Sequence, residues 1–252
     1  MLTTPVLGLI GVTVLATSFL SGIFGMAGGL ILLGVLLMFM DVAPAMVLFG
    51  TIQMGANGWR VLLWRAHVHW SLVWRYVIGA TAAFFVMRTV AFIPDKALLY
   101  IGLGILPFLA EALPEKYYPD ITRPGGPFLC GVIIMVLQLL AGAAGHILDM
   151  FFQKSGLDRR GIVGTKATCQ TIAHLYRIAY FGSLVTAFDA QVPWWAFVGA
   201  LLLAFAGTTM ASYVLERMSD ADFRTWSRRI VFAVGGSFLV RGLWLLAAAR
   251  LA

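Results

Sequence analysis

Charged residues are scarce in this sequence. Only 12% of its 252 residues are Asp, Glu, Lys or Arg, whereas 61% are hydrophobic, and the mean hydropathy is +0.91. A water-soluble domain cannot hide so much apolar surface in its core, so the composition excludes a soluble globular protein. The composition is typical of a polytopic membrane protein in contact with the lipid bilayer.

Catalytic and metal-binding motifs are also missing. The sequence contains no H-E-x-x-H and no G-x-S-x-G, and its acidic residues are scattered, which argues against an intramembrane enzyme. Cys130 and Cys169 lie in apolar segments without metal-ligand spacing, and the pair His67 and His69 lacks further ligand-type neighbours. We expect no enzymatic activity, no disulfide, no metal site and no cofactor.

A basic segment is absent from the start of the sequence. The apolar run from Pro5 onward continues without a plausible cleavage site, so we expect the first segment to stay in the mature protein. The net charge of +7 could suggest a nucleic-acid partner. However, the basic residues fall in short loops between apolar segments, where membrane topology explains them, so no nucleic acid is expected.

Apolar segments with the length of ordinary membrane spans occur in two trios. They lie at residues 44–64, 71–93, 96–113, 162–182, 193–215 and 226–248. A glycine-interrupted segment precedes each trio. Residues 5–40 would form one helix of about 54 Å, far longer than the hydrocarbon core of about 30 Å. We therefore predict a break near residues 22–29, which produces either a re-entrant hairpin or two short crossing helices.

This arrangement defines the domain organisation. Either form of the break gives each half an odd number of crossings, so we expect the second half to be inverted. A proline-rich and charged stretch separates a first repeat at 1–113, a cytoplasmic linker at 114–126 and a second repeat at 127–252. The predicted fold is all-α, with two inverted repeats that each contain a broken or re-entrant glycine-rich helix pair followed by three transmembrane helices.

The distribution of basic residues predicts the orientation in the membrane. With this topology nearly all Lys and Arg residues between spans collect on one face, and the other face keeps little beyond Lys96 and Arg250. The positive-inside rule places the basic face in the cytoplasm. We expect a multi-pass protein of the bacterial inner membrane with both termini in the periplasm. The sequence does not decide between a monomer and a homodimer.

One stretch of polar residues occurs twice. Residues 50–60 (GTIQMGANGWR) return as residues 167–177 (ATCQTIAHLYR), with Thr, Gln, Ala, an amide or imidazole, an aromatic ring and Arg at the same spacings. Each copy follows a glycine-containing break, at 21–25 and at 141–145. Duplicated halves with interrupted apolar segments are typical of secondary transporters, whose binding site lies where the halves meet.

The two copies predict a site for a small anion. A helix break exposes backbone N–H groups at a helix N-terminus, and glycine lets an oxyanion approach the backbone. Amide, hydroxyl, imidazole and guanidinium groups on one face of each repeated helix can add further donors. The predicted substrate-binding residues are Gly25, Gly28, Gly29, Thr51, Gln53, Asn57, Arg60, Gly145, His146, Thr168, Gln170, His174 and Arg177.

Several of these residues have an alternative role. Polar side chains inside membranes also join helices to one another, and Arg60, Arg177 and Lys166 could extend to lipid headgroups. Asp149 is the acidic residue nearest to a break, which makes it the candidate proton carrier. Its alternative role is that of a helix N-terminal partner or a solvated residue at the mouth of the site.

Two motifs resemble a known family. Gly22-Ile23-Phe24-Gly25-Met26-Ala27-Gly28-Gly29-Leu30-Ile31 resembles the glycine-rich signature of the TauE/SafE sulfite exporter family, and the region from Gly164 to Arg177 resembles its partner segment. The similarity in length, duplication and span order covers essentially the whole chain. It implies export of sulfite or small organosulfonates, with uptake as the alternative among relatives.

We therefore predict an anion exporter that works by alternating access. Moving one negative charge outward across an inside-negative membrane is favourable by about 2.3 kcal/mol per 100 mV, so export needs no coupling ion. An importer of small organic or sulfur oxyanions would need a proton or a sodium ion. An anion channel is a further alternative, because glycine-rich re-entrant segments also line pores.

Overall fold

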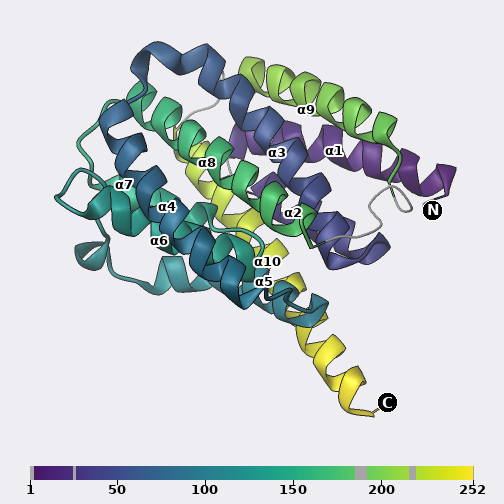
Figure 1. Ribbon diagram of the computed structural model, residues 1–252. Helices are drawn as coiled ribbons and strands as arrows, with labels where there is room; N and C mark the ends of the chain where they lie inside the picture. The colour runs from purple at the N-terminus through teal and green to yellow at the C-terminus, as the bar shows by residue number, and fades with distance from the viewer. Residues whose placement is uncertain (1–2, 25–26, 185–191, 216–219, 252) are drawn as a thin grey trace.

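The chain folds entirely into helices wherever its structure is described. The computed structural model describes residues 3–24, 27–184, 192–215 and 220–251, and every regular element in these ranges is helical (Figure 1). The first half contains α1 (Thr4–Phe24), α2 (Ala27–Phe39), α3 (Val42–Trp64), η1 (Arg65–His67), α4 (Trp70–Val90) and α5 (Lys96–Ala112). The all-helical prediction is confirmed.

The second half also contains five α-helices in the residues that the structure describes. After the short helix η2 (Glu115–Tyr117), it contains α6 (Gly126–Leu140), α7 (Gly145–Gln153), α8 (Arg159–Gly182), α9 (Trp194–Leu215) and α10 (Asp220–Leu251). The six segments predicted as ordinary spans correspond to α3, α4, α5, α8, α9 and α10. Of these, α10 differs most from its prediction, since it extends beyond the apolar segment 226–248 at both ends.

Local sequence signals set several helix ends. The carboxylates of Asp95 and Asp158 accept hydrogen bonds from the backbone N–H groups of Leu98 (2.7 Å) and Gly161 (3.3 Å), which caps α5 and α8. Gly125 adopts a positive φ of 78° directly before α6. These short caps allow long apolar helices to follow one another with short connections.

The two breaks divide their segments unequally. In the first half, α1 has 21 residues and α2 has 13, so α1 by itself has the length of a span, in contrast to the expected pair of short helices. In the second half, α7 has only 9 residues, or about 14 Å, which is too short to cross the hydrocarbon core. Gly142, with a positive φ of 80°, provides the turn between α6 and α7.

Four described helices are long and apolar enough to cross a membrane. They are at Thr4–Ile23, Trp70–Val90, Trp194–Ala211 and Arg228–Arg250. Large apolar side chains such as Ile78, Leu202 and Val240 are exposed on these helices, as expected for surfaces that face lipid. With 23 and 24 residues, α3 and α8 are also long, but they contain the repeated polar residues and lie in the interior. The chain is a polytopic membrane protein.

Helices of one half pack mainly on helices of the other half. The largest contacts between distant elements join α3 to α8, α1 to α9, α4 to α6 and α5 to α10 (Figure 1). The counterpart of each helix in the other half is the helix whose number differs by five, so that α1 corresponds to α6 and α4 to α9. The α1–α9 contact is then equivalent to the α4–α6 contact. The α3–α8 and α5–α10 contacts each join a helix to its own counterpart. The two halves therefore use equivalent helices for equivalent contacts, with α3 and α8 at the centre.

The segment between the halves is docked rather than extended. Ile121 is fully buried, and its backbone N–H donates to the carbonyl oxygen of Phe151 in α7 at 2.9 Å. The carboxylate of Asp120 accepts hydrogen bonds from the backbone and the hydroxyl of Thr122 at 2.8 and 2.6 Å. The predicted linker thus contacts the second half of the chain.

Candidate functional site

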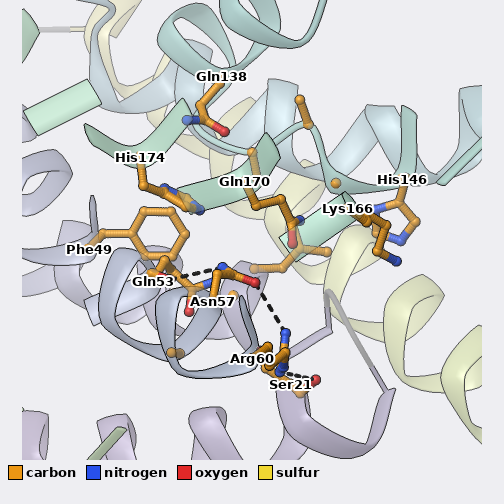
Figure 2. Close-up of a pocket in the computed structure, with 16 residues that line it drawn as sticks. Ser21, Phe49, Gln53, Asn57, Arg60, Gln138, His146, Lys166, Gln170 and His174 are labelled. Atoms are coloured by element: carbon orange, nitrogen blue, oxygen red, sulfur yellow. Dashed lines mark hydrogen bonds between the residues drawn. The ribbon is translucent and has the colours of Figure 1, made fainter. Parts of the chain in front are cut away.

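A polar cavity lies between α3 and α8 and is closed by the ends of α1, α2, α6 and α7. It encloses about 670 Å3 of empty space, which includes space open to solvent at its mouth. Figure 2 shows its side chains converging from both halves of the chain. The lining residues are Ser21, Gly29, Leu30, Phe49, Gln53, Ala56, Asn57, Arg60, Gln138, Ala143, Ala144, Gly145, His146, Lys166, Gln170 and His174.

The duplication of the sequence is visible in this lining. Gln53 and Gln170, which are 117 positions apart, both line the cavity. Four further pairs of lining residues have the same separation: Ser21 and Gln138, Gly29 and His146, Phe49 and Lys166, Asn57 and His174. Ten of the sixteen lining residues therefore form five equivalent pairs, one member from each half.

In the first half, the repeated arginine holds the end of α1. Arg60 in α3 donates from Nη2 to the carbonyl oxygen of Ser21 at 2.9 Å and from Nη1 to Oδ1 of Asn57 at 3.2 Å (Figure 2). Nδ2 of Asn57 in turn donates to the carbonyl oxygen of Gln53 at 2.9 Å. A cation at the C-terminal end of a helix also interacts favourably with the helix dipole.

The second half repeats this contact in a more buried form. Arg177 in α8 donates from Nη2 to the carbonyl oxygens of Gln138 (2.8 Å) and Gly142, where α6 ends. Its Nη1 lies 3.4 Å from Nδ1 of His174, and its guanidinium carbon lies 4.8 Å from the centre of the Phe49 ring. Ser21 and Gln138 both lie 39 positions before the arginine that binds their carbonyl group. Unlike Arg60, Arg177 is fully buried and does not line the cavity.

Residues 9–238 match the family described as Sulfite exporter TauE/SafE. The chain belongs to the TauE/SafE family. Searches of curated proteins and of solved structures found no match.

The matched region runs from α1 into α10 and includes both breaks and every residue of the cavity. The resemblance seen in the glycine-rich segment is thereby confirmed for most of the chain. Membership of the TauE/SafE family makes this protein a membrane transporter of the anion-exporter type rather than an enzyme.

The cavity of this TauE/SafE protein contains most of the predicted substrate-binding residues. Those among its lining are Gly29, Gln53, Asn57, Arg60, Gly145, His146, Gln170 and His174. Their side chains and backbone come from four different helices, α2, α3, α7 and α8, so only the folded chain brings them together.

The other predicted residues have different surroundings. The hydroxyl groups of Thr51 and Thr168 donate to backbone carbonyl groups one turn earlier in their own helices, at 3.0 and 2.8 Å. Gly28 packs against α1, where an added Cβ would lie 1.9 Å from the carbonyl oxygen of Thr17. Gly25 lies outside the described residues, and Arg177 contacts backbone, as described above.

Two lining residues that the repeated stretch did not reveal are Ser21 and Gln138. Both are nearly fully buried, and Oγ of Ser21 and Nε2 of Gln138 have no hydrogen-bond partner among the described residues. Buried polar groups are rarely left without a partner, so these two donors indicate a ligand or ordered water. Ser21 lies at the first glycine-containing break and Gln138 three residues before the second, and this position is the sequence signal that could have found them.

An ion pair lies at one side of the cavity. Lys166, a lining residue, bonds through Nζ to Oδ1 of Asp149, which does not itself line the cavity. Figure 2 shows Lys166 next to His146. Asp149 is therefore a partner of a lysine at the site.

The electrostatic character of the cavity favours anions. Two cationic side chains, Arg60 and Lys166, line it together with two imidazoles; Lys166 is paired with Asp149, and none of the lining residues that the structure describes is a carboxylate. In the described part of the chain, no group of three or more His, Cys, Asp or Glu residues could hold a metal ion. The remaining donors are amides and a hydroxyl, which suit an oxyanion.

Proposed function

We propose that this TauE/SafE protein is a secondary transporter that exports sulfite or small organosulfonate anions across the bacterial inner membrane. The observation that carries the proposal is the cavity between α3 and α8, in which two buried donors without partners, on Ser21 and Gln138, accompany cationic and amide groups. Fully ionised oxyanions of sulfur only accept hydrogen bonds, so a wall that carries donors and, in the described part of the chain, no carboxylate suits them.

The donors can surround a small anion from two sides. Gln53 and Gln170 are contributed by α3 and α8, and Ser21 and Gln138 by α1 and α6. Gly29 leaves room for this arrangement, since an added Cβ would lie only 2.8 Å from Nε2 of Gln53. Each half would thus supply one amide from its long polar helix and one donor from the end of its broken segment.

Alternating access between two inverted repeats, at residues 1–113 and 127–252, is the proposed mechanism. It is supported by the equivalent helix pairs of the two halves and by the pairs of lining residues with a constant separation. Because the cavity lies at the contact between α3 and α8, a relative movement of the halves would open it on either side in turn.

Outward movement is the energetically simple direction. The free energy of an anion falls by about 2.3 kcal/mol per 100 mV for each negative charge that it carries out of an inside-negative cell. Export can therefore proceed without a coupling ion. The proposed orientation has the basic loops in the cytoplasm and both termini in the periplasm. The lipid bilayer and a second copy of the chain are the further partners we propose.

Binding to purified protein tests this function. Sulfite, sulfoacetate, acetate and chloride would be titrated into the wild-type protein and into Gln53→Ala and Gln170→Ala by calorimetry. We expect sulfite or sulfoacetate to bind best and each substitution to weaken binding about tenfold, as expected for the loss of a hydrogen bond to a charged group.

A matched control is Thr171→Val, which changes the residue after Gln170 but lies outside the cavity. Its affinity should equal that of the wild type. Wild-type affinity in both glutamine variants would remove the proposed site. Counterflow of labelled substrate in proteoliposomes distinguishes a carrier from a channel, because only a carrier exchanges substrate across the membrane without net flux.

A further inference from the structure

We infer that Lys166 exchanges partners during transport: its ammonium group binds the carboxylate of Asp149 in the empty carrier and the substrate oxyanion in the loaded carrier. Asp149 is then a built-in competitor of the substrate. This inference rests on the proposed function, since it assigns a role to two residues of the same site.

The position of the pair makes such an exchange possible. Lys166 comes from α8 and lines the cavity, whereas Asp149 comes from α7 and approaches the ammonium group from outside the lining. The two side chains keep 25% and 31% of their accessible surface. Neither side chain is therefore fully enclosed by protein, which lowers the cost of separating the pair.

The ion pair has no equivalent in the first half. The positions 117 residues earlier are Leu32 and Phe49, both apolar and both buried in the core. The first half thus folds with two hydrophobic side chains where the second half has an ion pair. The ion pair is therefore a feature of the second half alone, where it lies beside the cavity.

The other two cations near the cavity are bound in a different manner. The guanidinium groups of Arg60 and Arg177 are held by backbone carbonyl groups at the ends of α1 and α6. These neutral acceptors belong to the fold and cannot leave. The partner of Lys166 is a carboxylate, which resembles the substrate in charge and in hydrogen-bond capacity. A lysine ammonium group on a flexible chain can also turn from one acceptor to another.

The exchange has a functional consequence. The ammonium group has a negative partner in both the empty and the loaded carrier, so the cavity does not bind its substrate as tightly as a free lysine would. Return of Asp149 to Lys166 favours release of the anion. Asp149 therefore lowers the affinity for the substrate and raises the turnover rate.

The central test is Asp149→Asn, with sulfite as the probe. We expect sulfite to bind about fivefold more tightly than to the wild type, which corresponds to about 1 kcal/mol for a partly exposed ion pair. In proteoliposomes the maximal rate should fall while the half-saturating sulfite concentration also falls. A purely structural role of Asp149 would not produce tighter binding.

Two further variants and a control complete the experiment. Lys166→Met should weaken sulfite binding at least about tenfold, and Asp149→Asn should have no further effect when combined with it. Glu111→Gln removes the 2.9 Å pair between Glu111 and Arg228, which lies outside the cavity, and should leave affinity unchanged. Thermal unfolding of every variant shows whether the binding measurements compare folded proteins.

The inference is overturned if Asp149→Asn binds sulfite with unchanged or weaker affinity. Loss of proton-dependent transport without tighter binding would also overturn it and would favour a proton-carrier role for Asp149. Failure of the proposed function has another signature, since the wild-type protein itself would then bind none of the tested oxyanions.

Discussion

The second half of the cavity wall carries more nitrogen-containing side chains than the first, although five lining positions of the repeat are shared. Where the first half has a glycine, a phenyl ring and a carboxamide, the second has two imidazoles and an ammonium group, at the pairs Gly29 and His146, Phe49 and Lys166, Asn57 and His174. The glutamine pair, in contrast, is unchanged. The duplication therefore preserves the frame of the site, while the two halves line it with different groups: each supplies one cation, Arg60 or the Asp149-paired Lys166, but only the second supplies imidazoles.

The repeated arginines show the same contrast in burial. Arg60 borders the cavity, whereas Arg177 has no accessible surface. Both bind carbonyl groups at the end of the broken segment in their own half. Their common role is to hold a helix end, and only the first is placed to contact a substrate as well.

The largest effect should come from replacing the buried arginine. Arg177→Met leaves two buried carbonyl groups without a donor, which should lower the free energy of unfolding by about 3 kcal/mol or more. Arg60→Met removes the donor of one carbonyl group at a more accessible site and should cost about 1 kcal/mol. Thermal and denaturant unfolding in detergent measure both. Equal losses in the two variants would contradict the difference in burial.

Replacing the donors without partners should separate binding from stability. Gln138→Leu and Ser21→Ala each remove a buried polar group that has no partner among the described residues, so the unfolding temperature should stay the same or rise. Sulfite binding should weaken by up to about tenfold in each. Calorimetry and unfolding on the same samples provide the comparison. Lower stability with unchanged binding would show that these donors serve the fold instead.

The smallest effect is expected when a residue of the second half is replaced by the residue at the equivalent position of the first half. His174→Asn places a carboxamide opposite Arg177, as Asn57 is placed opposite Arg60. We expect a change of less than about 1 kcal/mol in stability and at most about threefold in affinity, because an acceptor for the guanidinium group is retained. His174→Leu, which has no acceptor, should be clearly less stable. Similar losses in both variants would show that the imidazole has a role that the carboxamide cannot replace.

Much of the fold was predictable because it depends on periodic and local signals. The apolar segments became helices with nearly the expected bounds, and the break after Phe24 lies within the predicted range. The long first segment was harder, since hydropathy does not reveal that α1 has the full length of a span while α7 has only 9 residues. The position of a break depends on how glycines such as Gly142 pack, which is not a property of the segment alone.

The candidate site was predictable only in part. Repetition identified Gln53, Gln170 and their neighbours, because residues at intervals of about one helical turn share a face. It could not distinguish Arg60, at the cavity, from Arg177, which is enclosed by backbone. The repetition does not identify Ser21 and Gln138, because they lie on other helices, far from the repeated stretch in sequence.

The sequence by itself determined that this protein lies in a lipid bilayer, where its helices form and which polar stretches are duplicated. Hydrophobicity and spacing are properties of the chain. Only the tertiary structure decided which polar group meets a backbone carbonyl, which meets a carboxylate and which is left facing the cavity. The physical reason is that hydrogen-bond partners for buried groups come from neighbouring helices. In the two halves those neighbours are equivalent in position but different in side chain.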